Sequence, residues 1–127
     1  TGLSTGRRRS EVRLLSAETL PIPFWSRAGD EKRCDLVLEV APRRIERAEF
    51  HMVIWDGGAG AVMEPVKLNG HPLPVVGRGR HDVIYRRLEI DPLLLKEGRN
   101  EVTVLSDTEH HGIEVLLPGP ALMVRWS

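Results

Sequence analysis

The sequence of 127 residues is poor in cysteine and in aromatic residues, and it carries no excess of charge of either sign. Its single cysteine, Cys34, excludes a disulfide within the sequence, so the fold must be stabilised by its core. Lysine and arginine number 18, as do aspartate and glutamate, and this balance argues against a dedicated nucleic-acid-binding protein. No apolar run is long enough to cross a bilayer. We therefore expect neither a nucleic-acid nor a membrane partner.

The length fits one domain of ordinary size. The first ten residues, 1–10, are small, polar and basic, with a run of three arginines, Arg7 to Arg9. We expect residues 1–10 to form a flexible N-terminal segment and residues 11–127 to form a single domain.

Apolar residues in the rest of the chain alternate with polar ones. Ala48, Phe50, Met52 and Ile54 are the clearest case. This period of two is typical of half-buried strands, and the 9 prolines and 12 glycines lie mostly between such runs. The pattern predicts an all-β sandwich or barrel. We expect strands near 11–15, 34–41, 46–55, 62–68, 71–76, 82–90, 100–106, 112–117 and 121–126.

Two local signals are sharper than the alternation. Asn69-Gly70 lies between two alternating runs, and both residues tolerate the positive φ of a type I′ hairpin turn. The segment 91–98 begins with Asp91 as a helix cap and Pro92 at the first helical position, and Gly98 suits a left-handed exit. It predicts one helical turn between two strands.

These signals occur within a series of motifs, and the order of the motifs along the chain points to a known fold family. The series is WDGG at 55–58, VKLNG at 66–70, LEI at 88–90 and LLKEGRNEVTV at 94–104. Over about residues 34–126 it resembles the galactose-binding-like β-sandwiches that accompany glycoside hydrolase domains and occur among carbohydrate-binding modules. The resemblance implies an antiparallel β-sandwich (jelly roll) of about eight or nine strands and a sugar ligand. The family sometimes holds a structural calcium, but no matching run of calcium ligands is found here.

We find no sequence signature of an enzyme. No serine lies in a Gly-x-Ser-x-Gly elbow, and the segment 77–80, GRGR, lacks the lysine of a phosphate-binding loop. Cys34 opens an apolar run, which favours a core residue over a nucleophile. A carboxylate pair for glycoside hydrolysis is invisible in sequence. We predict no catalytic residues and no cofactor.

The pair His110-His111 is the best candidate for metal ligation, with Asp107 and Glu109 nearby. Adjacent strand residues point to opposite faces, so both histidines reach one ion only from a loop, and no spacing here matches a zinc site. We predict a polar loop and no metal.

A topological argument locates the candidate site. If every connection reverses the chain, one end of the sandwich collects the Asn69-Gly70 turn, residues 91–99 and residues 118–120. The other end collects the longer loops 16–33, 56–61, 77–81 and 107–111, and binding residues concentrate on such loops. Trp25 either stacks on a ligand there or, because 20–24 is apolar, plugs the core. The candidate ligand-binding residues are Trp25, Asp56, Arg78, Arg80, His81, Asp107, His110 and His111.

Two functions remain open from the sequence. One is a non-catalytic ligand-binding module, most plausibly for carbohydrate, which the charged loops favour. The other is an accessory structural or protein-interaction domain beside adjacent domains of a longer chain, which the aromatic content of only 5% favours.

Overall fold

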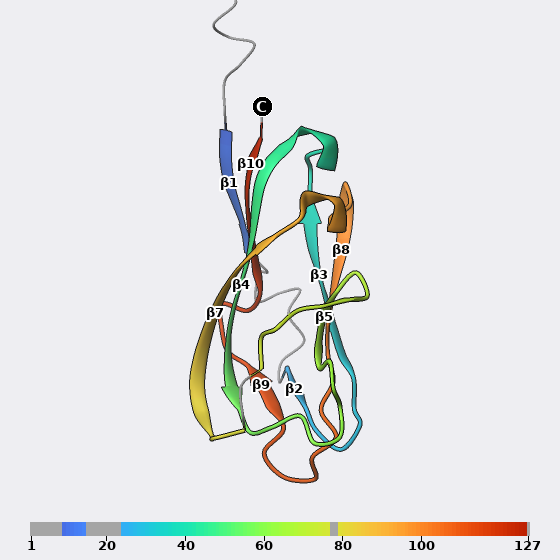
Figure 1. Ribbon diagram of the computed structural model, residues 1–127, viewed down its shortest axis with the longest axis vertical. Helices are drawn as coiled ribbons and strands as arrows, with labels where there is room; N and C mark the ends of the chain where they lie inside the picture. The colour runs from blue at the N-terminus through green and yellow to red at the C-terminus, as the bar shows by residue number, and fades with distance from the viewer. Residues whose placement is uncertain (1–8, 15–23, 77–78, 127) are drawn as a thin grey trace, which may run out of the picture.

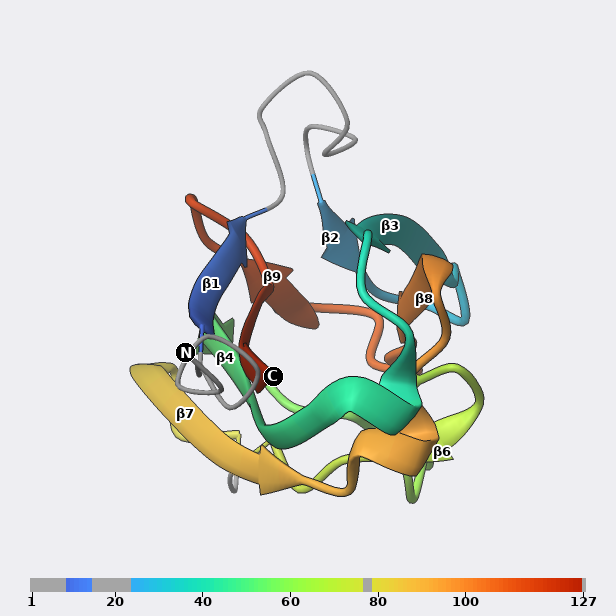
Figure 2. The same ribbon diagram turned by 90° about the horizontal axis from the view of Figure 1, so that it is seen from above.

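The computed structural model of the protein describes residues 9–14, 24–76 and 79–126 (Figure 1). These residues form two antiparallel sheets packed face to face, which Figure 2 shows as separate layers. The expected all-β antiparallel sandwich is confirmed. The described residues contain ten strands, of which two have only two residues each.

The larger sheet is built on one long strand. Its six strands are β1 (Arg9–Leu14), β2 (Trp25–Ser26), β4 (Ile45–Asp56), β7 (Asp82–Ile90), β9 (Ile113–Val115) and β10 (Ala121–Trp126). β4 pairs with β7 along one edge and with β10 and then β9 along the other. The smaller sheet has the order β3 (Lys32–Leu38), β8 (Gly98–Val104), β5 (Val66–Leu68) and β6 (His71–Pro72).

The expected element boundaries are matched closely for the long strands and poorly for the short ones. The expected strands at 62–68 and 71–76 shrink to β5 and β6, and β2 was not expected at all. A short 3-10 helix, Pro42–Arg44, precedes β4, and a second, Pro92–Leu94, follows β7. β1 begins at Arg9, and residues 1–8 of the expected N-terminal segment lie outside the described residues.

The connection between β9 and β10 corrects one prediction. Both strands run antiparallel to β4 on the same edge, at 54–56 and 45–51 respectively, so they share one direction. The backbone N–H of Leu116 donates to the carbonyl oxygen of Val53 at 2.9 Å, which places this connection beside the middle of β4. The prediction that 118–120 lies at the Asn69-Gly70 end is therefore wrong, because this connection does not reverse the chain.

The core lies between the sheets and is supplied by the inward residues of the long strands. Phe50 and Ile54 of β4 face Leu36 of β3 and Val102 of β8 in one cluster, and all four are at most 1% exposed. Cys34 belongs to this cluster, and burial, followed by the charges of Asp35 and Glu101, raises the pKa of its thiol to about 12. Cys34 is thus a core residue with an unreactive thiol, as expected.

Two of the motifs behind the family resemblance, VKLNG and LLKEGRNEVTV, meet at the end where β5 and β6 join. Asn69 Nδ2 donates to the carbonyl oxygen of Leu94 at 2.8 Å and to Oδ1 of Asn100 at 2.9 Å. Asn100 is fully buried, and its Oδ1 also accepts from the backbone of Lys96. Asp91 caps the 3-10 helix by accepting from the N–H of Leu93 at 2.9 Å. These asparagines therefore hold the hairpin and the helical turn together.

The hairpin itself supports a prediction. Asn69 and Gly70 have φ of 51° and 80°, as the expected type I′ turn requires. An added Cβ on Gly70 would meet no atom within 4 Å, so a substitution strains only the backbone. We expect Gly70→Val to lower the free energy of unfolding by about 1–3 kcal/mol in chemical denaturation. An unchanged value would show that the turn adopts another conformation in solution.

In the described ranges, no helix is long and apolar enough to cross a membrane.

Candidate functional site

The end of the sandwich opposite the Asn69-Gly70 hairpin is made of four loop segments. Backbone N–H groups of Ala28 and Gly29 donate to carbonyls of Thr108 and Ser106 at 2.7 and 2.8 Å. The N–H of Asp107 reaches the carbonyl of Ala59 at 3.0 Å. Segments 27–30, 56–61, 79–81 and 105–112 therefore meet. The predicted convergence of the loops is confirmed for the described residues (Figure 1).

Buried polar side chains fix these loops to one another. Asp56 is fully buried, and its two carboxylate oxygens accept from the backbone N–H groups of Gly58 at 3.0 Å and Gly79 at 3.2 Å. Ser106 is equally buried and donates its hydroxyl to the carbonyl of Gly58 at 2.7 Å. Its own N–H donates to Oγ of Ser26 at 2.8 Å. The carboxylate of Asp56 thus has a structural role and is buried beneath the surface.

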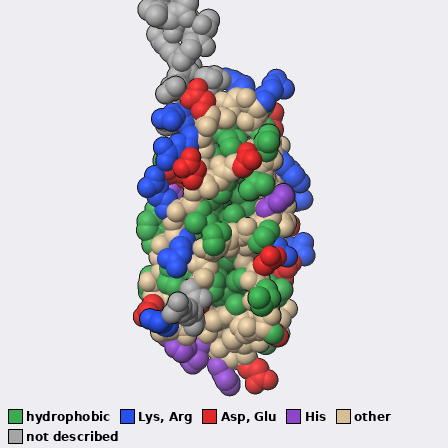
Figure 3. Space-filling model, viewed as in Figure 1, with side chains coloured by type: hydrophobic (Ala, Val, Ile, Leu, Met, Phe, Trp, Pro, Cys, Tyr) green, Lys and Arg blue, Asp and Glu red, His purple; other side chains and the backbone are tan. Residues whose placement is uncertain are grey.

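A cluster of rings lies on top of this framework. Trp55 is half-buried at the end of β4, and the rings of His81 and His111 lie 5.4 and 5.7 Å from it between centroids. The two histidine rings meet edge to face at 4.9 Å. The ring of His110 is 6.4 Å from that of His111. Figure 3 shows histidine side chains gathered at this lower end of the molecule.

His81 and His111 also have strained backbones, with φ of 63° and 66°. A residue with a side chain in this region is destabilised by about 1 kcal/mol or more, and such strain is found preferentially at functional sites. The backbone N–H of His81 donates to the carbonyl of Asp56 at 2.9 Å, which holds the strained residue beside Trp55.

A row of outward side chains extends the cluster across the larger sheet. Glu114 of β9 pairs with Trp25 of β2 on one side and with Trp55 of β4 on the other. Their neighbours Ser26, Asp56 and Ile113 are fully buried, so Trp25, Glu114 and Trp55 point to the outer face. Glu114 is exposed between two half-buried tryptophans. The row therefore combines two aromatic surfaces with one carboxylate.

Trp25 is therefore neither a plug in the core nor an open platform. Phe24 occupies the core position, with 3% exposure. The guanidinium of Arg27 lies 4.7 Å from the centroid of the Trp25 ring and covers part of that ring. The stretch 16–33 that was expected to be one loop includes β2 and the start of β3, and its residues 16–23 lie outside the described ranges.

The other candidate residues have mixed outcomes. Arg80, Asp107 and His110 are exposed at this end, and Arg78 lies outside the described residues.

The sequence interpretation missed Trp55 and Glu114. The alternation in β4 could have revealed Trp55, because it places this residue on the solvent side of the strand. An aromatic residue there does not fill the core, which suggests another role. In the part of the chain that the structure describes, no group of three or more His, Cys, Asp or Glu is placed to hold a metal ion.

A second feature, farther along the same face, connects five ionisable side chains. The hydroxyl of Tyr85 is 2.6 Å from Nδ1 of His51, and Nε2 of His51 is 3.2 Å from Oε1 of Glu49. Oε2 of Glu49 accepts from Arg87 at 2.6 Å and from Arg47 at 3.2 Å. Glu49 is only 2% exposed although it lies on the outer side of β4, because these partners cover it.

This network keeps Glu49 ionised. The hydrogen bond from Arg87, opposed by desolvation and aided by His51, lowers the pKa of Glu49 to about 2. A hydroxyl, an imidazole and a carboxylate in this order also occur in hydrolases. Here the hydroxyl is phenolic, and the two arginines already compensate the carboxylate. We therefore assign the network the role of orienting the rings of His51 and Tyr85.

Comparisons with known proteins show which solved structures share this fold. No family model and no curated protein matches the chain. Among solved structures, 92% of the chain is similar to 20% of BpGH86A, a β-porphyranase of glycoside hydrolase family 86 from the human gut bacterium Bacteroides plebeius, with 22% identity and a TM-score of 0.60. BuGH86 in complex with neoagarooctaose gives 12% identity and a TM-score of 0.64, over 93% of this chain and 18% of that one. The chain thus shares the fold of a segment that makes up about a fifth of these glycoside hydrolase chains.

Proposed function

We propose that this domain is a non-catalytic carbohydrate-binding module of the galactose-binding-like type, and that it binds sugar at the loop end on the outer face of the larger sheet. The observation that carries the proposal is the row Trp25, Glu114 and Trp55, with His81 and His111 beside it. An indole ring packs against the apolar C–H face of a sugar, while carboxylate and imidazole groups pair with its hydroxyls.

Two further observations support this assignment. The strained backbones of His81 and His111 hold their rings against Trp55, which favours a functional role over a packing role. The segments that share this fold belong to glycoside hydrolase chains, and one of these whole chains was solved in complex with neoagarooctaose. A domain of this kind would keep its parent enzyme on the polysaccharide.

An alternative is an accessory domain that packs beside an adjacent domain. Val83 and Tyr85 of β7 are 64% and 56% exposed on the same face, and Leu117 is 60% exposed. The chain spans about a fifth of the proteins whose fold it shares, which leaves room for such a neighbour. The contacts of the His81 and His111 rings with Trp55 favour the binding module over this alternative.

The test is calorimetric titration of the 127-residue chain with soluble oligosaccharides of agarose, xylan, cellulose and β-1,3-glucan, neoagarooctaose among them. We expect at least one to bind without turnover, and Trp55→Ala to weaken binding about tenfold or more. His111→Gly should also weaken binding while the melting temperature stays level, because glycine accepts the φ of 66° at this position.

Leu93→Ala is the matched control. Leu93 is 82% exposed and lies beside the Asn69-Gly70 hairpin, far from Trp55, so its removal should leave binding unchanged. Absence of binding across the panel, or turnover that one point substitution abolishes, would overturn the proposed function.

A further inference from the structure

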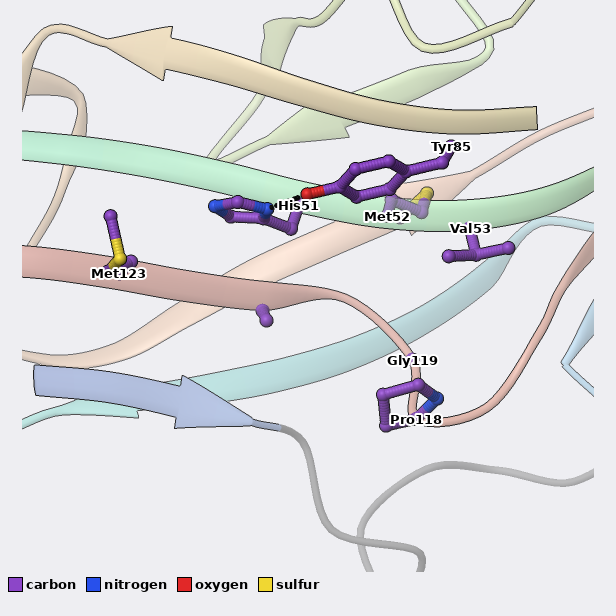
Figure 4. Close-up of a pocket in the computed structure, with 8 residues that line it drawn as sticks. His51, Met52, Val53, Tyr85, Pro118, Gly119 and Met123 are labelled. Atoms are coloured by element: carbon purple, nitrogen blue, oxygen red, sulfur yellow. Dashed lines mark hydrogen bonds between the residues drawn. The ribbon is translucent and has the colours of Figure 1, made fainter.

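A depression of about 230 Å³ lies on the outer face of the larger sheet (Figure 4). It lies farther along β4 than the Trp25–Trp55 row. Val53, His51 and Tyr85 line it from β4 and β7, and Pro118 and Met123 close its other side. It exists because β9 and β10 are one interrupted strand: the connection that carries Pro118 and Gly119 leaves the sheet here and forms a wall.

The rings of His51 and Tyr85 form a flat platform in this depression. Their planes differ by 24° and their centroids lie 5.9 Å apart, while the hydroxyl of Tyr85 is only 2.6 Å from Nδ1 of His51. The rings therefore lie nearly edge to edge with a modest tilt, and Figure 4 shows the hydroxyl of Tyr85 pointing at the His51 ring. Such a surface presents an aromatic face, and the two polar groups at its centre pair with each other.

The platform is held in place before any ligand arrives. Glu49, the outward residue before His51 on β4, binds Nε2 of His51 at 3.2 Å, and Arg87 and Arg47 fix Glu49. Because these rings do not have to be ordered on binding, the entropy lost on association is smaller than for free side chains. The buried carboxylate thus acts on the platform through His51.

The depression and Trp55 lie along one line. His51, Val53 and Trp55 are successive outward residues of β4, and four residues at about 3.3 Å each put His51 about 13 Å from Trp55. Tyr85 pairs with Val53, between the two. One sugar ring cannot cover both positions, but an extended chain of several rings can.

We infer that this depression is a second sugar subsite, and that the ligand is an unbranched oligosaccharide lying along β4 from Trp55 to His51. The inference rests on the proposed function. It identifies the ligand class as an extended chain bound through several units rather than a single terminal sugar.

The shape of the depression supports a ring as its occupant. Its volume of about 230 Å³ exceeds the 150 Å³ or so of a protein cavity that accommodates benzene. The apolar walls from Val53, Pro118 and Met123 suit C–H groups, while the hydroxyl of Tyr85, which uses only part of its capacity on His51, offers a partner to a sugar hydroxyl. A sugar ring presents both kinds of surface.

The test compares an octasaccharide with the disaccharide of the same repeat, beginning with neoagarooctaose, by calorimetric titration of the whole chain. The wild type should bind the octasaccharide about tenfold or more tightly than the disaccharide. Tyr85→Ala should remove most of that advantage and change disaccharide binding less than about twofold. Trp55→Ala should weaken both.

Two further variants separate the platform from general stability. Tyr85→Phe keeps the ring and loses the hydroxyl, so it should retain more of the octasaccharide affinity than Tyr85→Ala. Val37→Ala removes an equally exposed apolar side chain, 58% exposed, from β3 of the other sheet, and should change nothing.

The outcomes are distinguishable. If the panel contains a ligand but Tyr85→Ala binds its octasaccharide as the wild type does, the second subsite is wrong and the proposed function stands. If octasaccharide and disaccharide bind equally, the extended ligand is likewise wrong. If no glycan binds the wild type, the proposed function and this inference both fail, and the apolar face is then better explained as a contact with an adjacent domain.

Discussion

Gly112→Ala is expected to lower the free energy of unfolding by about 3–5 kcal/mol, the largest effect of any substitution considered. A Cβ on Gly112 would overlap the carbonyl oxygen of Ser26. Because the obstructing atom belongs to the backbone of β2, no side-chain rotation relieves the overlap. The loop and β2 must separate, which disturbs the register that places Trp25 beside Glu114. Urea denaturation followed by tryptophan fluorescence measures the loss.

Gly98→Ala is the control for this substitution. Gly98 has a φ of 93° but no atom within 4 Å of an added Cβ, so only backbone strain of about 1–2 kcal/mol is expected. Gly57→Ala should resemble Gly112→Ala, because its Cβ would overlap the carbonyl oxygen of His111. If Gly112→Ala loses no more stability than Gly98→Ala, the loop end is packed less tightly than described, and the aromatic row is not fixed.

Glu49→Ala should lower the free energy of unfolding by about 2–4 kcal/mol, because it removes a buried carboxylate that accepts from Arg87, Arg47 and His51. Arg87 is 56% exposed and can return to water, which limits the loss. The rings of His51 and Tyr85 should also become mobile. Octasaccharide affinity should therefore fall even at temperatures where the variant is fully folded.

The pH dependence of this effect has a definite sign. The pKa of Glu49 is lowered from 4.5 to about 2 in the folded state, so folding favours the ionised form. The resulting stability is fully present above about pH 4.5 and is lost as the pH falls through about 2. Wild type and Glu49→Gln should therefore differ most at about pH 6 and converge near pH 2 in urea denaturation. A difference that stays constant over this range would contradict the ionised network.

Local signals in the sequence were sufficient to predict much of the fold. The alternation at 46–55 and 82–90 identifies β4 and β7 because each strand has one face on the core. Asn69-Gly70 and Asp91-Pro92 predict their turns because the backbone geometry there depends on those residue types alone. The convergence of the loops was predictable from the order of the strands. When successive strands alternate in direction, every second connection lies at the same end of the sandwich.

The features that the sequence did not predict depend on contacts between distant segments of the chain. The direction of β10 after β9 is decided by pairing with β4, which no local pattern at 118–120 reveals. Asp56 is conspicuous in the sequence as a loop carboxylate, but the backbones of Gly58 and Gly79 take up both its oxygens. The platform of His51 and Tyr85 joins residues 34 apart, and it becomes visible only when β4 and β7 are placed in register.

The most direct test of the central claim, that sugar binds along the outer face of β4, is a nuclear magnetic resonance titration of the 15N-labelled chain with the best-binding octasaccharide. The account predicts shifts of the Trp55 indole N–H and of the backbone N–H groups of His111, Val53 and Tyr85, with none at Asn69 or Leu93. Shifts confined to the Asn69 end, or no shifts at saturating sugar, would contradict it.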